Sequence, residues 1–182
     1  MKALMLQYHF DSTRDSRSNS PSIQKELYYL IRISQVWYPE ILHWYFQKFV
    51  PGLNHDSRHI LTFIVDNKVA GIALLKNEAA EKKICTFRVK DQYRNNGIGK
   101  TLFRRCLEIL ETDKPMITVP SERLSYFSNL FKHYDFKLEQ VVQDYYRSNS
   151  SEYVFNGSLT PPSLSIPTHQ PFLRKRGGKA PS

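Results

Sequence analysis

The chain has 182 residues, 41% of them hydrophobic, and carries a formal net charge of +9 at pH 7. This length supports a single domain with a full hydrophobic core. No apolar run reaches the roughly 18 residues of a membrane-spanning helix, and the run over 1–10 lacks a signal-peptide pattern, so we expect a cytoplasmic protein with no membrane partner. The positive charge favours an acidic or polyanionic partner.

The N-terminal third predicts one strand and two helices. Residues 2–10 are expected to form the first strand of a sheet. Apolar residues at helical spacing then mark a helix over 23–31. A second helix is predicted to begin at Pro39 and to end before Pro51-Gly52, because a proline interrupts the hydrogen bonding of a helix interior.

The middle of the chain predicts three strands. Residues 59–65 and 69–75 are apolar runs on either side of the turn signal Asp66-Asn67, a pattern typical of a β-hairpin. A third strand is predicted over 82–89 from the alternation of its side chains. One face of this strand is expected to carry Ile84, Thr86 and Arg88, and the other Cys85, Phe87 and Val89.

The stretch Arg94-Asn95-Asn96-Gly97-Ile98-Gly99-Lys100 joins this strand to an amphipathic helix predicted over 98–110. Two glycines at a strand-to-helix turn let the backbone approach a ligand and leave N–H groups free at the helix start. These groups and the helix dipole favour an anion such as phosphate. The motif is not a P-loop, which would need glycine at Arg94, nor a dinucleotide fingerprint, which would need glycine at Leu102.

One helix and three strands complete the predicted pattern: a strand over 115–119, a helix over 123–133, and strands over 137–146 and 152–155. We expect one domain over 1–157, followed by a disordered basic tail over 158–182. The tail is rich in proline and has no acidic residue, and such a segment cannot bury enough surface to offset its ordering entropy. It either holds a phosphate-rich partner such as RNA or is only a solubilising terminus.

No metal site is expected. Cys85 and Cys106 lie on a predicted strand and on a buried helix face, so they are expected to be core residues of a protein in a reducing compartment. His55 and His59 have the spacing of a metal pair, but they follow Pro51-Gly52 and do not lie in a predicted helix.

The pattern Arg-x-x-Gly-x-Gly, carried by Arg94, Gly97 and Gly99, resembles the acetyl-CoA pyrophosphate loop of the GNAT superfamily of N-acetyltransferases. The order of the elements predicted over 60–157 agrees with this resemblance. It implies an α/β (α+β) fold, with a single mixed, mostly antiparallel, twisted and splayed sheet flanked by about four helices. It also implies that acetyl-CoA is the co-substrate and that an amine attacks the thioester directly.

The resemblance also places acetyl-CoA on this chain. The pantetheine arm is expected to pair with the third strand beside Phe87 and Val89. The pyrophosphate is expected on the glycine loop, at Arg94, Asn95, Asn96, Gly97, Ile98, Gly99 and Lys100. The two N-terminal helices would form a wall of the acceptor groove, and their aromatic residues either line it or pack in the core: Trp37, Tyr38, Trp44, Tyr45, Phe46 and Phe49.

The usual proton-transfer residues of the family are absent. Phe131 occupies the position of the family's general acid, a tyrosine, and Lys83 that of the strand glutamate that acts as base. Tyr126 and Ser128 are therefore the candidate acids, although the thiolate of CoA is a good leaving group without one. Glu81, two residues before Lys83 on the same strand face, is the candidate base.

We therefore predict an acetyl-CoA-dependent N-acetyltransferase that is a monomer or a homodimer. Its acceptor is left open among an aminoacyl-tRNA, another nucleic-acid-associated amine and an acidic protein. The absent tyrosine and glutamate leave an alternative, a non-catalytic module that binds CoA or RNA on the same fold.

Overall fold

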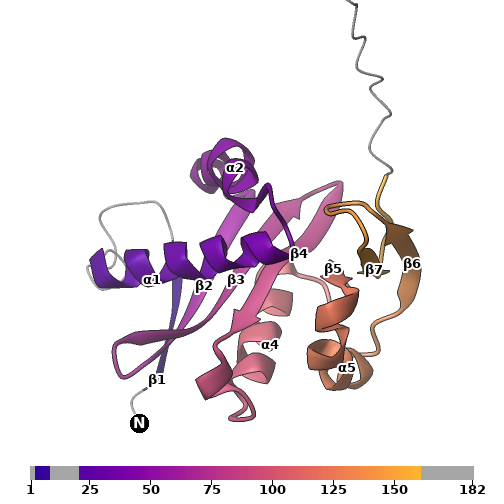
Figure 1. Ribbon diagram of the computed structural model, residues 1–182. Coiled ribbons are helices and arrows are strands. Elements are labelled where there is room, and N and C mark those ends of the chain that lie inside the picture. Colours follow the sequence, from indigo (N-terminus) through magenta and orange to yellow (C-terminus); the bar gives the residue numbers. More distant parts are fainter. Residues whose placement is uncertain (1–2, 9–20, 161–182) are drawn as a thin grey trace, which may run out of the picture.

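The computed structural model describes residues 3–8 and 21–160, so the polar connection after the first strand and nearly all of the predicted tail lie outside the described residues. A seven-stranded sheet forms the centre of the protein, in the order β1-β2-β3-β4-β5-β7-β6 (Figure 1). Neighbouring strands are antiparallel except β4 and β5, which confirms the predicted mixed sheet. The strands are β1 (Ala3–Tyr8), β2 (Arg58–Val65), β3 (Lys68–Glu78), β4 (Glu81–Val89), β5 (Met116–Pro120), β6 (Leu138–Gln143) and β7 (Ser151–Phe155).

Helices cover both faces of this sheet. The apolar side of α1 packs with α2 and with one face of β2 and β3. The buried residues of α4, together with α5, pack on the other face against β4, β5 and β7. The helix predicted over 98–110 is confirmed at both ends. The helices are α1 (Pro21–Arg32), α2 (Ile41–Trp44), α3 (Val50–Gly52), α4 (Ile98–Leu110) and α5 (Leu124–His133).

The second helical stretch runs further than the sequence predicts. The predicted end before Pro51-Gly52 is wrong, because α2 continues through a π-helical turn, Tyr45–Phe49, directly into α3. In this turn the Val50 N–H donates to the Tyr45 carbonyl. A proline in a regular α-helix lacks a donor and clashes with the preceding turn. The wider turn changes the hydrogen-bond register just before Pro51, and the helix therefore passes the proline.

A β-bulge in β4 changes which side chains share a face. Leu74 lies opposite Thr86 and Leu75 lies opposite Ile84, so Cys85 is an extra residue in β4. Ile84 and Phe87 consequently pack in the same cluster beneath α4, whereas Cys85 packs in the cluster beneath α1. The predicted strict alternation over 82–89 is therefore wrong. One inserted residue moves every side chain on one side of it to the opposite face of the sheet.

The strands β4 and β5 separate at this bulge. They pair only at Lys83 with Met116 and at Ile84 with Ile117. Beyond these pairs, β4 continues beside β3 and β5 continues beside β7. Because a bulge bends its strand, β4 turns away from β5, and within the described residues its backbone from Cys85 to Val89 has no strand partner on that side. The predicted splay of the sheet is confirmed.

Two further features concern the limits of the domain. Leu159 is buried with Met116 and Val154, so the chain still packs against the sheet two residues beyond the expected domain end at 157. No helix within the described ranges combines the length and the apolar character needed to cross a membrane.

Candidate active site

A cleft opens where β4 and β5 diverge. Its walls come from the segment after α1, from β4, from β5 and from the start of α5. The space between these walls is about 510 Å³, including the part open to solvent. The lining residues are Ser34, Trp37, Tyr38, Ile84, Cys85, Thr86, Phe87, Arg88, Ile117, Thr118, Val119, Pro120, Arg123 and Phe127.

The glycine loop lies beside this cleft, at the N-terminus of α4. Gly97 is the residue before the helix and has a φ of 75°, in the left-handed region that glycine adopts without strain. A Cβ atom added at Gly97 would meet nothing within 4 Å, and one added at Gly99 would meet only the Val89 side chain, at 3.9 Å. The loop therefore faces open space that a ligand can enter.

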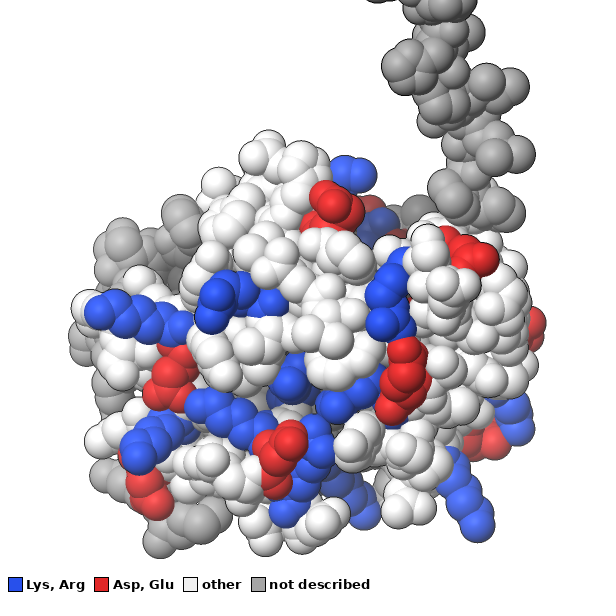
Figure 2. Space-filling model, in the orientation of Figure 1, with Lys and Arg blue, Asp and Glu red and all other residues white. Residues whose placement is uncertain are grey.

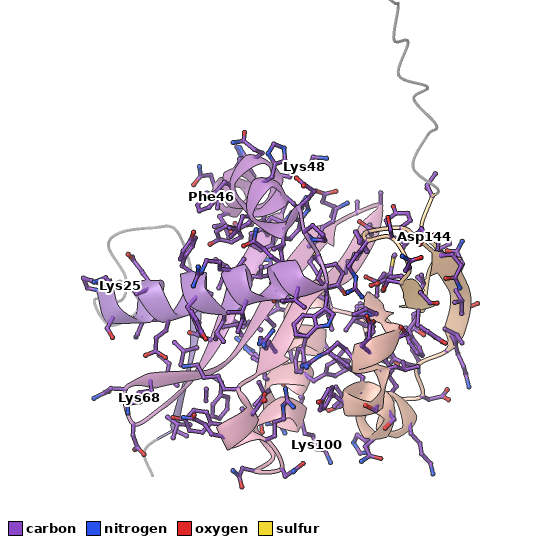
Figure 3. The ribbon with its side chains drawn as sticks, in the orientation of Figure 1. Lys25, Phe46, Lys48, Lys68, Lys100 and Asp144 are labelled. Atoms are coloured by element: carbon purple, nitrogen blue, oxygen red, sulfur yellow. The ribbon has the colours of Figure 1, made fainter. Side chains whose placement is uncertain are left out.

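The first turn of α4 offers donors to such a ligand. No side chain caps the helix at Gly97, and the Thr101 N–H is the first to donate within it, to the Gly97 carbonyl at 3.0 Å. The N–H groups before Thr101 have no acceptor inside the helix. Lys100 is exposed on this turn (Figure 3). Backbone donors, the helix dipole and a nearby ammonium group together suit a phosphate.

Arg94 connects this loop to the end of β4. Its guanidinium lies 2.6 Å from the Asp91 carboxylate, and its Nε donates to the Val89 carbonyl at 3.4 Å. Asn95 follows with a φ of 60° and is exposed, as is Asn96. The predicted loop residues are thus together, between the end of β4 and the start of α4.

Phe87 lines the cleft, and Val89 follows it on β4, near the glycine loop. The Phe87 ring packs against Phe103 of α4, with 5.5 Å between the ring centroids. Val89 is packed in a small cluster with Ile98. The free N–H and C=O groups of this strand edge can pair with an extended ligand as another strand would.

Sequence comparison agrees with this geometry. A family model described as an acetyltransferase (GNAT) domain matches residues 35–149. The chain belongs to the GNAT family of acetyltransferases. A search of curated proteins finds no significant match.

Solved structures of GNAT proteins share the fold of this chain. An IAA acetyltransferase from Bacillus cereus ATCC 14579 superposes with a TM-score of 0.58 at 15% identity, over 85% of this chain and 97% of that one. A GNAT-family protein from Desulfovibrio desulfuricans gives 0.58 at 10% identity over the same shares, 85% and 97%. The PaiA N-acetyltransferase from Thermoplasma acidophilum, a structure in complex with coenzyme A, gives 0.56 at 18% identity over 87% and 100%.

The residues that the sequence suggests for proton transfer lie in different places in this GNAT domain. Tyr126 is 56% exposed, and its ring lies 4.3 Å from the guanidinium carbon of Arg94, next to the glycine loop. Ser128 is exposed, and its hydroxyl donates to the Ser125 carbonyl at 2.9 Å. Glu81 is the first residue of β4, at the opposite end of the strand from the loop, and accepts a hydrogen bond from Lys76 at 2.5 Å.

A buried glutamate that the sequence does not single out lies behind the cleft wall. Glu152 of β7 is only 4% exposed and accepts a hydrogen bond of 3.0 Å from the Tyr38 hydroxyl. The hydroxyl of Thr118 also interacts with this carboxylate. Burial raises the pKa of Glu152 to about 7, although Thr118, Tyr38 and the charge of Lys83 act in the opposite direction. The only sequence signal is an acidic residue in a short, otherwise apolar strand.

The aromatic residues of the N-terminal helices divide between the cleft and the core. Trp37 and Tyr38 line the cleft. Tyr45 and Phe49 are buried in the core beneath α1. Phe46 is 51% exposed and lies on the other side of α1 from Lys100 (Figure 3). Both interpretations of this aromatic set therefore apply, each to different members.

In the part of the chain that the structure describes, the cleft offers neither a reactive thiol nor a cluster of metal ligands. Burial raises the pKa of Cys85 to about 11, so this thiol is protonated at neutral pH and is a poor nucleophile. Cys106 is buried beneath α4, and its pKa is also raised by burial. Within the described residues, no three His, Cys, Asp or Glu side chains gather as a metal site.

Proposed function

We propose that this GNAT domain is a cytoplasmic, acetyl-CoA-dependent N-acetyltransferase that acts by direct attack of an amine on the thioester. One observation carries the proposal: an open, donor-rich loop at the start of α4 follows β4, whose edge beyond the bulge borders the cleft and is unpaired within the described residues. Membership of the GNAT family supports it. The free thiols of Cys85 and Cys106 agree with a reducing compartment.

The loop and the strand edge suit two different parts of acetyl-CoA. The N–H groups from Gly97 to Lys100 would hold the pyrophosphate, with Arg94 keeping the loop in place. The β4 edge beside Phe87 and Val89 would pair with the amides of the pantetheine arm. When bound, acetyl-CoA supplies the activated acetyl group, and these residues hold it with its thioester near the bulge.

The acceptor amine must lose a proton to attack, and we propose Glu152 as the final acceptor of that proton. Tyr38 lines the cleft and donates its hydroxyl proton to Glu152. When the Tyr38 oxygen takes a proton from the amine, Tyr38 therefore passes its own hydroxyl proton to the Glu152 carboxylate. A pKa of about 7 suits a base that works at neutral pH. Glu81 remains the second candidate, although Lys76 occupies its carboxylate.

The remaining proton belongs to the departing thiolate. The C–S bond breaks as the new N–C bond forms, and Tyr126 beside the loop is the candidate donor to sulfur. Ser128 is the weaker candidate, because its hydroxyl is bonded to its own helix. A thiol pKa near about 8.5 makes the thiolate an adequate leaving group, so we expect a small contribution from either residue.

Calorimetric titration with acetyl-CoA, followed by a free-thiol release assay, tests this function. The assay uses amine, peptide and aminoacyl-tRNA acceptors. We expect binding at micromolar protein and turnover with at least one acceptor. Absence of acetyl-CoA binding would overturn the proposal.

A non-catalytic module that binds CoA or RNA is the second candidate. It is favoured by Phe131 at the usual acid position, where the ring is buried between Phe127 and Phe136 and has no polar group. Turnover on any acceptor in the thiol-release assay would exclude this candidate.

A further inference from the structure

A column of alternating cations and aromatic rings borders the cleft. The guanidinium carbon of Arg88 lies 5.3 Å from the centroid of the Trp37 ring, and that of Arg123 lies 4.6 Å from the centroid of the same ring. Arg123 also lies 4.3 Å from the Tyr126 ring, which Arg94 contacts at 4.3 Å. These residues come from β4, the turn after α1, the start of α5 and the glycine loop. Figure 2 shows Lys and Arg side chains gathered in this region, below α1.

Two of these three arginines lack an acidic partner. Arg94 is bound to Asp91, but within the described residues neither Arg88 nor Arg123 forms an ion pair. Burial lowers the pKa of both, and neighbouring arginines lower it further, while the charge of Asp91 acts in the opposite direction. Half-buried guanidinium groups that repel one another are unfavourable unless an anion joins them.

Arg88 and Arg123 lie away from the surface that suits acetyl-CoA. Phe87 packs against α4, so Arg88, the next residue of the strand, projects to the opposite face and meets Trp37. The glycine loop lies at the start of α4, on the other face. Tyr38, which donates to Glu152, lines the same cleft next to Trp37 in sequence. The unpaired arginines and the proposed proton acceptor therefore border the acceptor end of the cleft.

We propose that the acceptor is a small amine that carries a carboxylate or a phosphate, and that Arg88 and Arg123 bind this anionic group. The inference rests on the proposed function. A guanidinium binds either anion through two parallel hydrogen bonds, and both guanidinium groups contact the ring of Trp37, which keeps them near one another.

The test uses acceptor pairs that differ only in the anionic group: β-alanine with β-alaninamide, L-phenylalanine with its amide, and phosphoethanolamine with ethanolamine. We compare kcat/KM calculated on the concentration of neutral amine, because the amino group of an amide has a different pKa from that of the amino acid. We expect the anionic member of at least one pair to be at least about tenfold better. The amino-acid pairs report carboxylate recognition, and the phosphoethanolamine pair reports phosphate recognition.

Variants then connect this preference to the two arginines. Arg88→Gln and Arg123→Gln should remove the preference by raising KM for the anionic acceptor, with little change in kcat or in the Kd for acetyl-CoA. Arg105→Gln is the matched control, because Arg105 is exposed on α4 and paired with Glu108 at 2.8 Å. It should keep the preference of the unmodified protein.

Binding of acetyl-CoA, measured without an acceptor, distinguishes a failure of this inference from a failure of the proposed function. Three results would overturn the inference while acetyl-CoA still binds: no turnover of any pair member, equal turnover within every pair, or a preference that both variants retain. Equal loss of acetyl-CoA affinity in both arginine variants would also overturn it, since the arginines would then belong to the CoA surface. Absence of acetyl-CoA binding in the unmodified protein would overturn the proposed function and this inference with it.

Discussion

At the scale of single residues, the carboxylate of Glu152 is the group whose surroundings most clearly indicate a chemical role. It is buried in a short strand, accepts the Tyr38 hydroxyl at 3.0 Å and has a pKa of about 7. A buried carboxylate that is only partly stabilised by hydrogen bonds costs stability whenever it is ionised. A buried carboxylate with a raised pKa beside a cleft is typical of a functional residue.

This shifted pKa predicts how stability depends on pH. Between the ordinary carboxyl pKa of 4.5 and about 7, the folded state binds more protons at Glu152 than the unfolded state. The free energy of unfolding should therefore fall as pH rises through this range, by about 2 kcal/mol between pH 5 and 8. Urea unfolding should show this loss in the unmodified protein but not in Glu152→Gln. The exposed Glu139→Gln is the control and should behave like the unmodified protein.

The same residue should determine the pH dependence of catalysis. If Glu152 accepts the proton through Tyr38, kcat/KM should rise with pH through about 7. Glu152→Gln and Tyr38→Phe should each remove this rise and lower the rate about 10²–10⁴-fold. Glu81→Gln should keep the rise. A normal profile in Glu152→Gln together with its loss in Glu81→Gln would reverse the assignment of the base.

The position of the missing tyrosine has a structural explanation. Phe131 is buried, with its ring 4.2 Å from Phe155 and stacked on Phe127 and Phe136. A hydroxyl added there would enter an apolar cluster. We expect Phe131→Tyr to lower the free energy of unfolding by about 1–3 kcal/mol, without raising kcat. Chemical denaturation and the thiol-release assay measure the two effects, and a large rise in kcat would show that this position reaches the thioester.

At the scale of elements, the connection between β4 and α4 is the part of the fold on which the proposed binding of acetyl-CoA depends. The bulge at Cys85 separates β4 from β5, and the glycine loop presents its donors beside the free strand edge. Neither element is sufficient alone, because the strand edge can pair with amides but not with a pyrophosphate. Together they match a ligand with an extended amide arm and an anionic group.

A substitution at Gly99 should separate stability from binding. Gly99 lies in the first turn of α4, and an added Cβ would come no closer than 3.9 Å to Val89. Gly99→Ala should therefore raise the free energy of unfolding by about 0.5–1 kcal/mol, because alanine favours the helix. The same methyl group would lie where the pyrophosphate needs to approach. Calorimetry should show weaker acetyl-CoA binding, and unchanged affinity would argue against this placement.

At the scale of the whole molecule, the proposed function assigns acetyl-CoA and the acceptor to different sides of the splayed sheet. One core lies beneath α4 and α5, and another, against which Tyr38 packs, lies beneath α1 and α2. The cleft lies between these two halves. Residues far apart in the sequence therefore meet in one site, and the distribution of charge over it agrees with two anionic ligands, one on each side.

Local patterns in the sequence were enough to predict most elements and the glycine turn before α4. The ends of α4, the hairpin of β2 and β3 and the glycine turn all depend on side-chain periodicity or on turn residues, which act over a few neighbouring positions. The bulge at Cys85 and the π turn before Pro51 have no such signal, because each depends on how the strand or helix packs. Glu152 lies 114 residues from Tyr38, and Arg88 and Arg123 both contact Trp37, which is distant from them in the sequence. Only the tertiary structure decides such contacts, because burial and charge proximity arise when distant segments pack together.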